Sequence, residues 1–171
     1  AVVSTQSTGT VAKRSLIRTH LNFLHLSKLI KMADKYLGKY DRVSADKYDE
    51  FLKELGVNML LRKAATASSP VFEVTYDTDS ETWSFKTSTM LKSMELKFKL
   101  NEEFDEKSPD GRDVKAKVTK EGDSFISIQN AVKEGEKSTK IVREFKGDEV
   151  IQTSTIVGCD LVCTQVFKKQ A

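Results

Sequence analysis

Arg143 is the residue whose sequence context points most directly to chemistry. If the chain is extended here, side chains alternate between two faces, and Arg143 shares its face with Ile141 and Phe145. An arginine between two large apolar residues is unusual, because a guanidinium that leaves water without a partner costs about 3–5 kcal/mol. We therefore expect an anion to meet Arg143.

Two later segments place further polar residues on apolar faces. Gln152 lies between Val150 and Ser154 on one expected strand face, and Gln165 shares another with Phe167. If these segments are neighbouring strands, one arginine and two glutamines project into the same interior. No carboxylate lies on the same faces, so the predicted partner of the arginine is a ligand.

Catalytic and metal-binding chemistry finds little support in the sequence. Both histidines, His20 and His25, lie in the first 31 residues, so the rest of the chain cannot assemble a histidine-based nucleophile. Cys159 and Cys163 would lie about 13 Å apart along one strand. That distance is too long for a disulfide, and two cysteines without histidine make a poor zinc site. We expect no catalytic residue, no metal and no cofactor.

The elements that would position these residues follow from turn spacing. Between recurrent glycines lie short segments rich in Val, Ile, Phe and Thr, a pattern typical of an antiparallel meander. With further strands expected at 36–43, 70–76 and 81–88, the total is about ten, and a sheet of that length closes to remove its edges. We predict an all-β, ten-stranded antiparallel up-and-down β-barrel, too wide for its side chains to fill. The glycines are Gly111, Gly122, Gly135, Gly147 and Gly158.

A helix pair interrupts the expected strands. Ser44 is expected to cap a helix that ends at Gly56, because apolar residues recur there at helical spacing. A second helix is expected from about Asn58, ended by Pro70. The pair is too short to form a domain, so we expect a helix-turn-helix lid over one end of the barrel.

Charge separates the chain into two parts. Residues 1–31 hold five Lys and Arg and no acid, which leaves 23 of the 28 basic residues and all 25 acidic residues in the rest. We expect a basic N-terminal extension at 1–31, partly disordered or helical, and a barrel domain at 32–171. The near-neutral domain argues against a nucleic-acid partner. The extension is also compatible with a transit segment or a membrane-surface helix, so a cytoplasmic location is expected, with organelle targeting or secretion as alternatives.

The stretch from Lys35 to Lys169 resembles the intracellular lipid-binding proteins, the fatty-acid-binding and cellular retinoid-binding family. The resemblance is collinear over many segments, so it is far more specific than a single motif. The matching segments are Gly38-Lys39-Tyr40, Tyr48 to Val57, Phe98 to Glu106, Asp110 to Lys115, Ile141 to Phe145 and Val162 to Lys169.

The resemblance implies a clam-like barrel that carries one or two long-chain lipids as a monomer. In the family, an interior arginine at the position of Arg143 meets a fatty-acid carboxylate, and the intestinal-type branch adds a glutamine where Gln152 stands. Many members carry an Arg-x-Tyr triplet where this chain has Gln165-Val166-Phe167. The retinol-binding branch shares that ending but has a glutamine at the position of Arg143. We expect fatty-acid transport, with a retinoid carrier as the alternative, because a buried cation selects a carboxylate over an alcohol.

The resemblance also suggests where the rest of the ligand lies. Trp83, Met94, Leu96, Phe98, Phe145 and Phe167 are expected to line the acyl chain, although plain core packing explains any one of them equally well. Residues expected near the mouth are Tyr48, Leu52, Leu61, Ala64 and Leu91. Lys53, Arg62 and Lys63 give the lid a basic exterior, either for transient contact with anionic membranes or as an ordinary solvated face.

One position departs from the family pattern in the first strand. Arg42 stands where the family usually has an apolar residue, so Val43 is expected to take the inward role. A protein-interaction module remains the other alternative to a carrier. It predicts a filled barrel and no lipid bound after purification.

Overall fold

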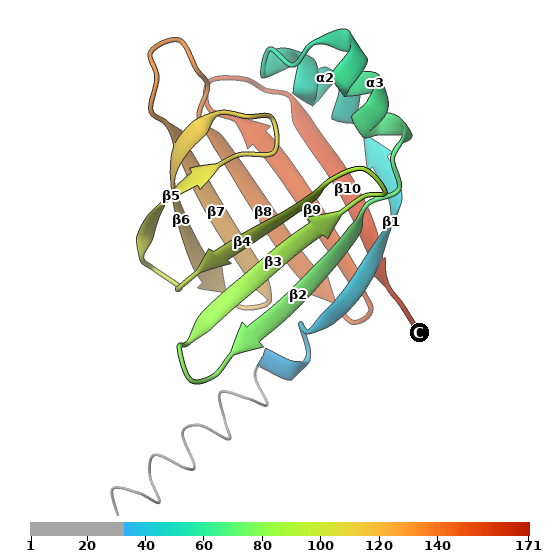
Figure 1. Cartoon of the computed structure of the whole chain (residues 1–171), viewed down its shortest axis with the longest axis vertical. Coiled ribbons are helices and arrows are strands. Elements are labelled where there is room, and N and C mark those ends of the chain that lie inside the picture. Colours follow the sequence, from blue (N-terminus) through green and yellow to red (C-terminus); the bar gives the residue numbers. More distant parts are fainter. Residues whose placement is uncertain (1–32) are drawn as a thin grey trace, which may run out of the picture. The chain divides into compact units, whose positions relative to one another are not determined.

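A computed structural model describes residues 33–171 (Figure 1). The expectations for residues 1–31 lie outside the described residues. The features below belong to the compact unit Tyr36–Ala171.

Ten strands form one antiparallel sheet in the order β4-β3-β2-β1-β10-β9-β8-β7-β6-β5. The first strand, β1, pairs with the last strand, β10, and the two edges of the sheet are β4 and β5. The predicted ten-stranded, nearly closed barrel is confirmed. The strands are β1 Gly38–Asp46, β2 Val71–Asp77, β3 Thr82–Ser88, β4 Ser93–Phe98, β5 Glu103–Lys107, β6 Asp113–Glu121, β7 Ser124–Ala131, β8 Thr139–Lys146, β9 Glu149–Ile156 and β10 Val162–Lys169.

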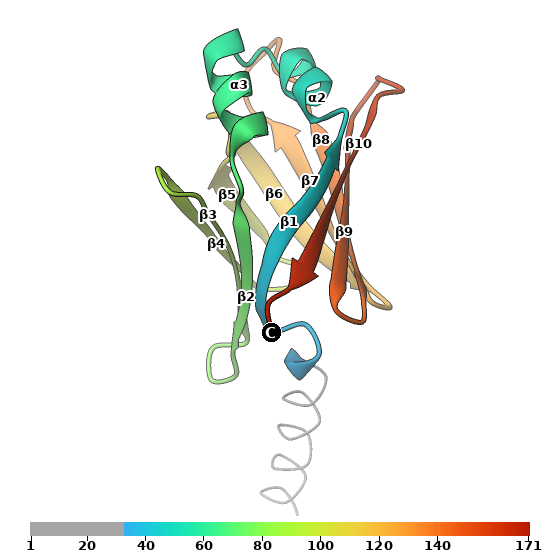
Figure 2. The ribbon, with the colours of Figure 1, turned by 90° about the vertical axis from the view of Figure 1, so that its right-hand side faces the viewer.

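The sheet folds over on itself into two layers. In Figure 1 the strands β2 to β4 lie in front of, and run across, β7 to β9. Figure 2 shows the two helices together over one end of the strands. They are α2 (Tyr48–Glu54) and α3 (Met59–Ala67), inserted between β1 and β2 as predicted.

The helix starts were only partly predicted. The Asn58 side chain accepts a hydrogen bond from the Leu61 backbone N–H at 3.0 Å, which confirms the expected cap of α3. The expected cap of α2 by Ser44 is wrong. Ser44 lies in β1 opposite Val166, because β1 keeps pairing with β10 as far as Asp46, and α2 begins after Lys47 without a side-chain cap.

The expectation for Val43 is also wrong. Arg42 pairs with Phe167 and Ser44 with Val166, so Val43 is an extra residue in a β-bulge, and it is 57% exposed. Arg42 lies two residues after the buried Tyr40 and opposite the buried Phe167, so it is on the inward face, and the bulge shifts the alternation only for the residues that follow it.

Aromatic side chains fill the end of the barrel away from the helices. The fully buried Phe125 ring lies 4.8 Å from Trp83, 5.3 Å from Tyr36 and 5.6 Å from Phe145, centroid to centroid. Tilted and edge-to-face pairs of this kind add to the free energy gained by burial. They give the barrel a packed base above which the polar residues lie.

Candidate functional site

Strand register brings the predicted polar residues into one row. Arg143 on β8 pairs with Gln152 on β9, and Gln152 pairs with Gln165 on β10. All three lie on the inner face, between the aromatic base and the helix-covered end. The expectation that these segments are neighbouring strands is confirmed.

Arg143 has an unusual environment for a charged group. Within residues 33–171 its side chain forms no hydrogen bond or ion pair, and its Nε is buried without a partner. The guanidinium carbon lies 5.5 Å from the ring centroid of Phe72 and 5.4 Å from that of Phe85. These cation–π contacts compensate only part of the lost hydration.

The pKa of Arg143 reflects this burial. Burial lowers the pKa from 12.5 to about 10, and the negative charge of Glu106 opposes the decrease. The group therefore stays charged at neutral pH. Although Arg143 is strongly desolvated, it keeps some accessible surface.

The two glutamines beside Arg143 differ in their bonding. Gln152 is half-buried and forms no side-chain hydrogen bond with the described residues. Gln165 is 6% exposed, and its Oε1 accepts a hydrogen bond from Nη1 of Arg42 at 3.1 Å. The row therefore contains two side-chain amides, and of these only Gln165 has its oxygen in a hydrogen bond, with Arg42.

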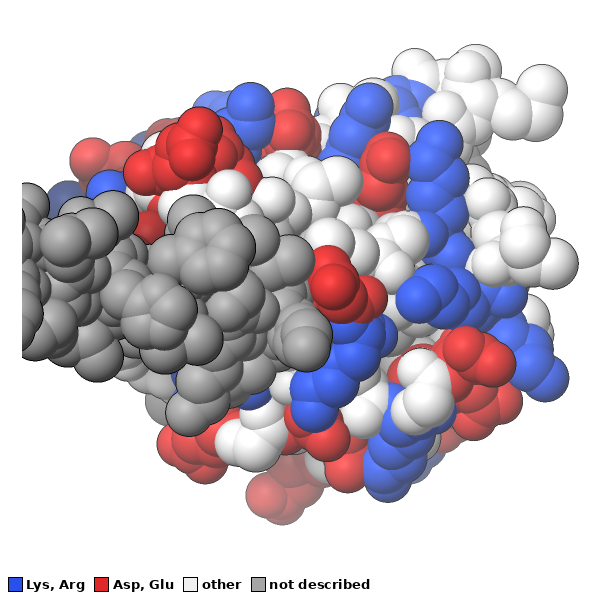
Figure 3. Space-filling view, turned by 90° about the horizontal axis from the view of Figure 1, so that it is seen from below, with Lys and Arg blue, Asp and Glu red and all other residues white. Residues whose placement is uncertain are grey.

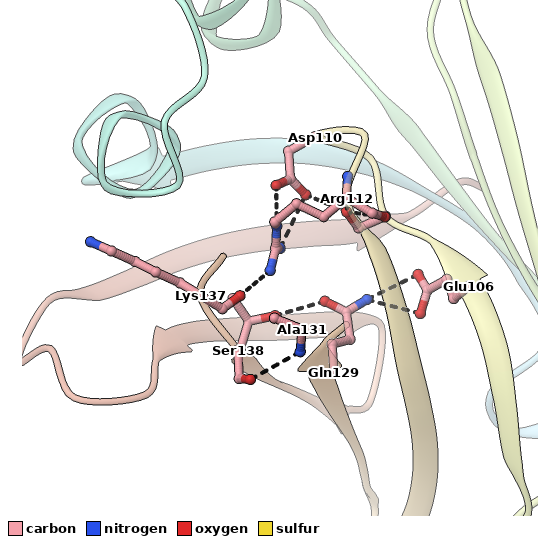
Figure 4. Close-up of polar contacts among 9 residues, drawn as sticks. Glu106, Asp110, Arg112, Gln129, Ala131, Lys137 and Ser138 are labelled. Carbon is pink, nitrogen blue, oxygen red and sulfur yellow. Dashed lines mark hydrogen bonds and ion pairs between the residues drawn. The ribbon is translucent and has the colours of Figure 1, made fainter. Parts of the chain in front are cut away.

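Glu106 is an interior carboxylate that the sequence reasoning missed. It lies on the inner face of β5, and both of its carboxylate oxygens accept from Nε2 of Gln129 at 2.9 Å (Figure 4). Oε1 of Gln129 in turn accepts from the Thr139 hydroxyl at 2.7 Å. Burial raises the pKa of Glu106, while Gln129 and the charge of Arg143 counteract the rise. Glu106 lies two residues after Phe104 and therefore shares its strand face, which was the signal in the sequence that it points inward.

A buried ion pair fixes two turns at the helix-covered end. Arg112 contacts Asp110 through Nε and Nη2, and its Nη1 donates to the Lys137 carbonyl oxygen (Figure 4). Both charged side chains are less than 10% exposed. Burial by itself would raise the pKa of Asp110, but hydrogen bonds from Arg112 and Ser108 outweigh it and lower the pKa. The pair ties the β5–β6 turn to the β7–β8 turn.

The predicted lining residues lie in different parts of the barrel. Trp83 and Phe145 belong to the packed aromatic base, and Phe98 packs on Phe85 and stacks on Phe104 between the edge strands. Met94 and Leu96 are half-buried on β4. Phe167 is buried next to Phe72, 5.8 Å between ring centroids, and Phe72 in turn contacts the guanidinium of Arg143.

The residues predicted near the mouth occur around the helix-covered end, with different exposure. Leu52 is buried against Ile156 and Cys163, whereas Leu61 and Leu91 are 57% and 95% exposed. Tyr48 is half-buried and Ala64 is exposed.

The predicted basic exterior of the lid is smaller than expected. Nε of Arg62 lies 3.0 Å from Oδ1 of Asp49 and Nη1 donates to the Val57 carbonyl, so this arginine ties α3 to α2. Lys53 and Lys63 are exposed. Basic and acidic side chains also lie interspersed over the face shown in Figure 3, in line with their similar numbers.

Residues 33–171 show no sign of a metal site or a membrane-spanning helix. This part of the chain holds no group of three or more His, Cys, Asp or Glu side chains arranged to hold a metal ion. Its helices are too short and too polar for any of them to cross a membrane. Both cysteines are free, and burial raises the pKa of the Cys163 thiol to about 11.

Comparison with known proteins gives consistent matches. The model of the lipocalin / cytosolic fatty-acid binding protein family matches residues 37–170. The fatty acid-binding protein of Tyrophagus putrescentiae is 45% identical over 133 residues, which is 78% of this chain and 96% of that protein. The apo structure of Caenorhabditis elegans lipid binding protein 8 has a TM-score of 0.75 and 33% identity, covering 80% of this chain and 96% of that one. A Schistosoma mansoni fatty acid binding protein in complex with arachidonic acid has a TM-score of 0.73 and 29% identity, covering 81% of this chain and 98% of that one.

Proposed function

This chain belongs to the lipocalin / cytosolic fatty-acid binding protein family, and from that membership we propose that it binds and transports long-chain fatty acids inside the barrel. The fatty-acid carboxylate bonds to Arg143, with Gln152 as a second donor. Phe167 and the half-buried residues of β4 contact the acyl chain.

The observation that supports this proposal best is the unpartnered guanidinium of Arg143. Its Nε is buried without an acceptor, and Gln152, its neighbour across β8 and β9, has an amide free of hydrogen bonds to the described residues. A carboxylate accepts several hydrogen bonds and carries the charge that Arg143 lacks. A fatty acid satisfies both groups at once, whereas an alcohol leaves the positive charge unpaired.

Glu106 refines the electrostatic argument. The charge of this carboxylate lowers the cost of burying Arg143, but the two side chains form no direct ion pair. Its own oxygens bond to Gln129 instead. Glu106 therefore makes the buried charge of Arg143 less costly, and the guanidinium is still free to bind an anion directly.

Burial of the acyl chain supplies most of the binding free energy. Moving about fifteen methylenes out of water is worth on the order of 12 kcal/mol at ~0.8 kcal/mol each. Immobilising the ligand and desolvating its head group offset much of this. We expect dissociation constants in the nanomolar to micromolar range, which permits both capture and release.

We extend the proposal to the mode of action. The protein is a monomeric carrier without catalysis, acting in the cytoplasm, and its lid touches anionic membranes briefly during transfer. Leu60, 78% exposed on α3, and the exposed Lys53 and Lys63 are the contact residues. Leu60→Asp should slow fatty-acid transfer to phosphatidylserine vesicles without changing affinity. Transfer at the wild-type rate would exclude this contact.

A displacement titration tests the main proposal. Oleate should bind delipidated protein more tightly than all-trans-retinol, and Arg143→Gln should weaken oleate binding by about 30-fold to 1000-fold, corresponding to about 2–4 kcal/mol for one buried charge pair. Lys140→Gln, an exposed change on the same strand, is the matched control. Retinol displacing oleate from wild-type protein would favour the retinoid carrier. Uptake of neither ligand would favour the interaction module.

A further inference from the structure

Arg42 lies on β1, a strand that supplies no residue to the proposed head-group site, and it contacts the row formed by Arg143, Gln152 and Gln165. It lies on β1 opposite Phe167, one residue before the bulge at Val43, and is half-buried on the inner face. Beyond the bulge, Ala45 pairs with Gln165, the last member of the row. The guanidinium of Arg42 contacts both Gln165, on the inner face, and the ring of Tyr48, the first residue of α2.

The guanidinium of Arg42 is held on several sides. Nη2 donates to the backbone carbonyls of Thr66 at 3.3 Å, Ala65 at 3.4 Å and Ser68, at the C-terminal end of α3. The guanidinium carbon also lies 5.3 Å from the Tyr48 ring centroid. Carbonyls at a helix C-terminus carry partial negative charge, so they favour a cation at this place. Because these contacts hold Arg42, it is poorly suited to bind a ligand directly.

The remaining contact of Arg42 determines how the Gln165 amide is oriented. Nη1 donates to Oε1 of Gln165 at 3.1 Å. A guanidinium has no acceptor, so the amide must present its oxygen to Arg42 and its NH₂ group elsewhere. That NH₂ group forms no hydrogen bond with the described residues and keeps some accessible surface. Gln165 is paired with Gln152, which is paired with Arg143, so the NH₂ group belongs to the same row.

We infer that Arg42 is a positioning residue that fixes Gln165 as a hydrogen-bond donor and thereby sharpens selection of a carboxylate over an alcohol. This inference rests on the proposed function. A carboxylate needs only donors, and the row then offers Arg143 and the NH₂ groups of Gln152 and Gln165. An alcohol also needs an acceptor for its own O–H, and because Arg42 occupies the Gln165 oxygen, only the Gln152 oxygen of the two amides is left for it.

The test compares oleate with oleyl alcohol, which has the same chain and a different head group. Arg42→Leu should lower the preference for oleate by about threefold to tenfold, the effect of one hydrogen bond. Gln165→Leu should lower it comparably, and Arg42→Leu should have no further effect in that background. Arg42→Lys should stay within about twofold of wild type, because an ammonium still donates to Gln165.

A control and a wild-type measurement separate this role from support of the fold. Lys39→Leu, at an exposed position of the same strand, should leave the preference unchanged. In wild-type protein, the side-chain N–H resonances of Gln165 should shift more with oleate than with oleyl alcohol, whatever the stability of the variants. An equal loss of both affinities in Arg42→Leu, or unshifted Gln165 resonances, would show that Arg42 only fastens α3. Failure of the proposed function itself would appear separately, as unchanged oleate affinity in Arg143→Gln.

Discussion

Replacing Arg143 by glutamine should make the lipid-free protein more stable, although it impairs ligand binding. Burial lowers the pKa of Arg143 from 12.5 to about 10. At 1.36 kcal/mol per pKa unit, holding the guanidinium charged in the folded state costs about 3 kcal/mol. A neutral glutamine does not carry this cost.

Part of the gain is offset by lost contacts. The cation–π contacts with Phe72 and Phe85, together worth about 1–2 kcal/mol, disappear in the variant. We therefore expect Arg143→Gln to raise the free energy of unfolding by about 1–2 kcal/mol. The corresponding urea midpoint should rise by roughly 0.5–1 M.

The assay is urea unfolding of delipidated protein, followed by the fluorescence of Trp83, the single tryptophan, and by circular dichroism. Lys140→Gln should change stability by less than about 0.5 kcal/mol. Because the folded state disfavours the charged form, the gap between wild type and Arg143→Gln should persist at neutral pH and narrow as the pH rises above about 10. A loss of more than about 1 kcal/mol in Arg143→Gln would refute the reasoning, since it would mean that Arg143 already has a stabilising partner.

Three further predictions concern the surrounding structure and use the same unfolding assay. Asp110→Ala should cost about 3–5 kcal/mol at neutral pH, because it leaves Arg112 buried without its partner. The pKa of Asp110 is lowered in the folded state, so this contribution holds above pH 3.8 and fades below it; a gap that stays constant in acid would contradict this. The pKa of Glu106 is raised above 4.5 by burial, so Glu106→Gln should become more stable relative to wild type as the pH rises through that pKa, whereas a constant difference would show that burial does not perturb Glu106. Phe125→Ala should cost about 3–5 kcal/mol, and a loss below 1 kcal/mol would mean that the aromatic base is not tightly packed.

The sequence was most informative where one strand follows the next without irregularity. Alternation around Arg143, Gln152 and Gln165 predicted their shared face, because antiparallel strands joined by tight turns keep their register. Asn58 was predictable as a helix cap because its side chain bonds locally. Such features depend on residues near one another in the chain.

Features that depend on distant pairing could not be predicted in this way. The bulge at Val43 exists because β1 pairs with β10, and an extra residue reverses the alternation without leaving a mark in the local sequence. The same pairing extends β1 through Ser44, so Ser44 is a strand residue and does not cap α2. Glu106 was missed because β5 is five residues long, too short for its alternation to stand out. The partner of Arg62, Asp49, lies on the preceding helix and becomes evident only from helix packing.

The most direct test of the central claim is the ionisation of a bound fatty acid. Oleate labelled with ¹³C at its carboxyl carbon, bound to the wild-type protein, can be followed by NMR from about pH 8 to about pH 4. A carboxylate that contacts Arg143 should stay ionised through the range in which a free carboxyl group becomes protonated, and this protection should vanish in Arg143→Gln. A carboxyl resonance that titrates as it does in water, in wild type and variant alike, would contradict the assignment of Arg143 as the head-group partner.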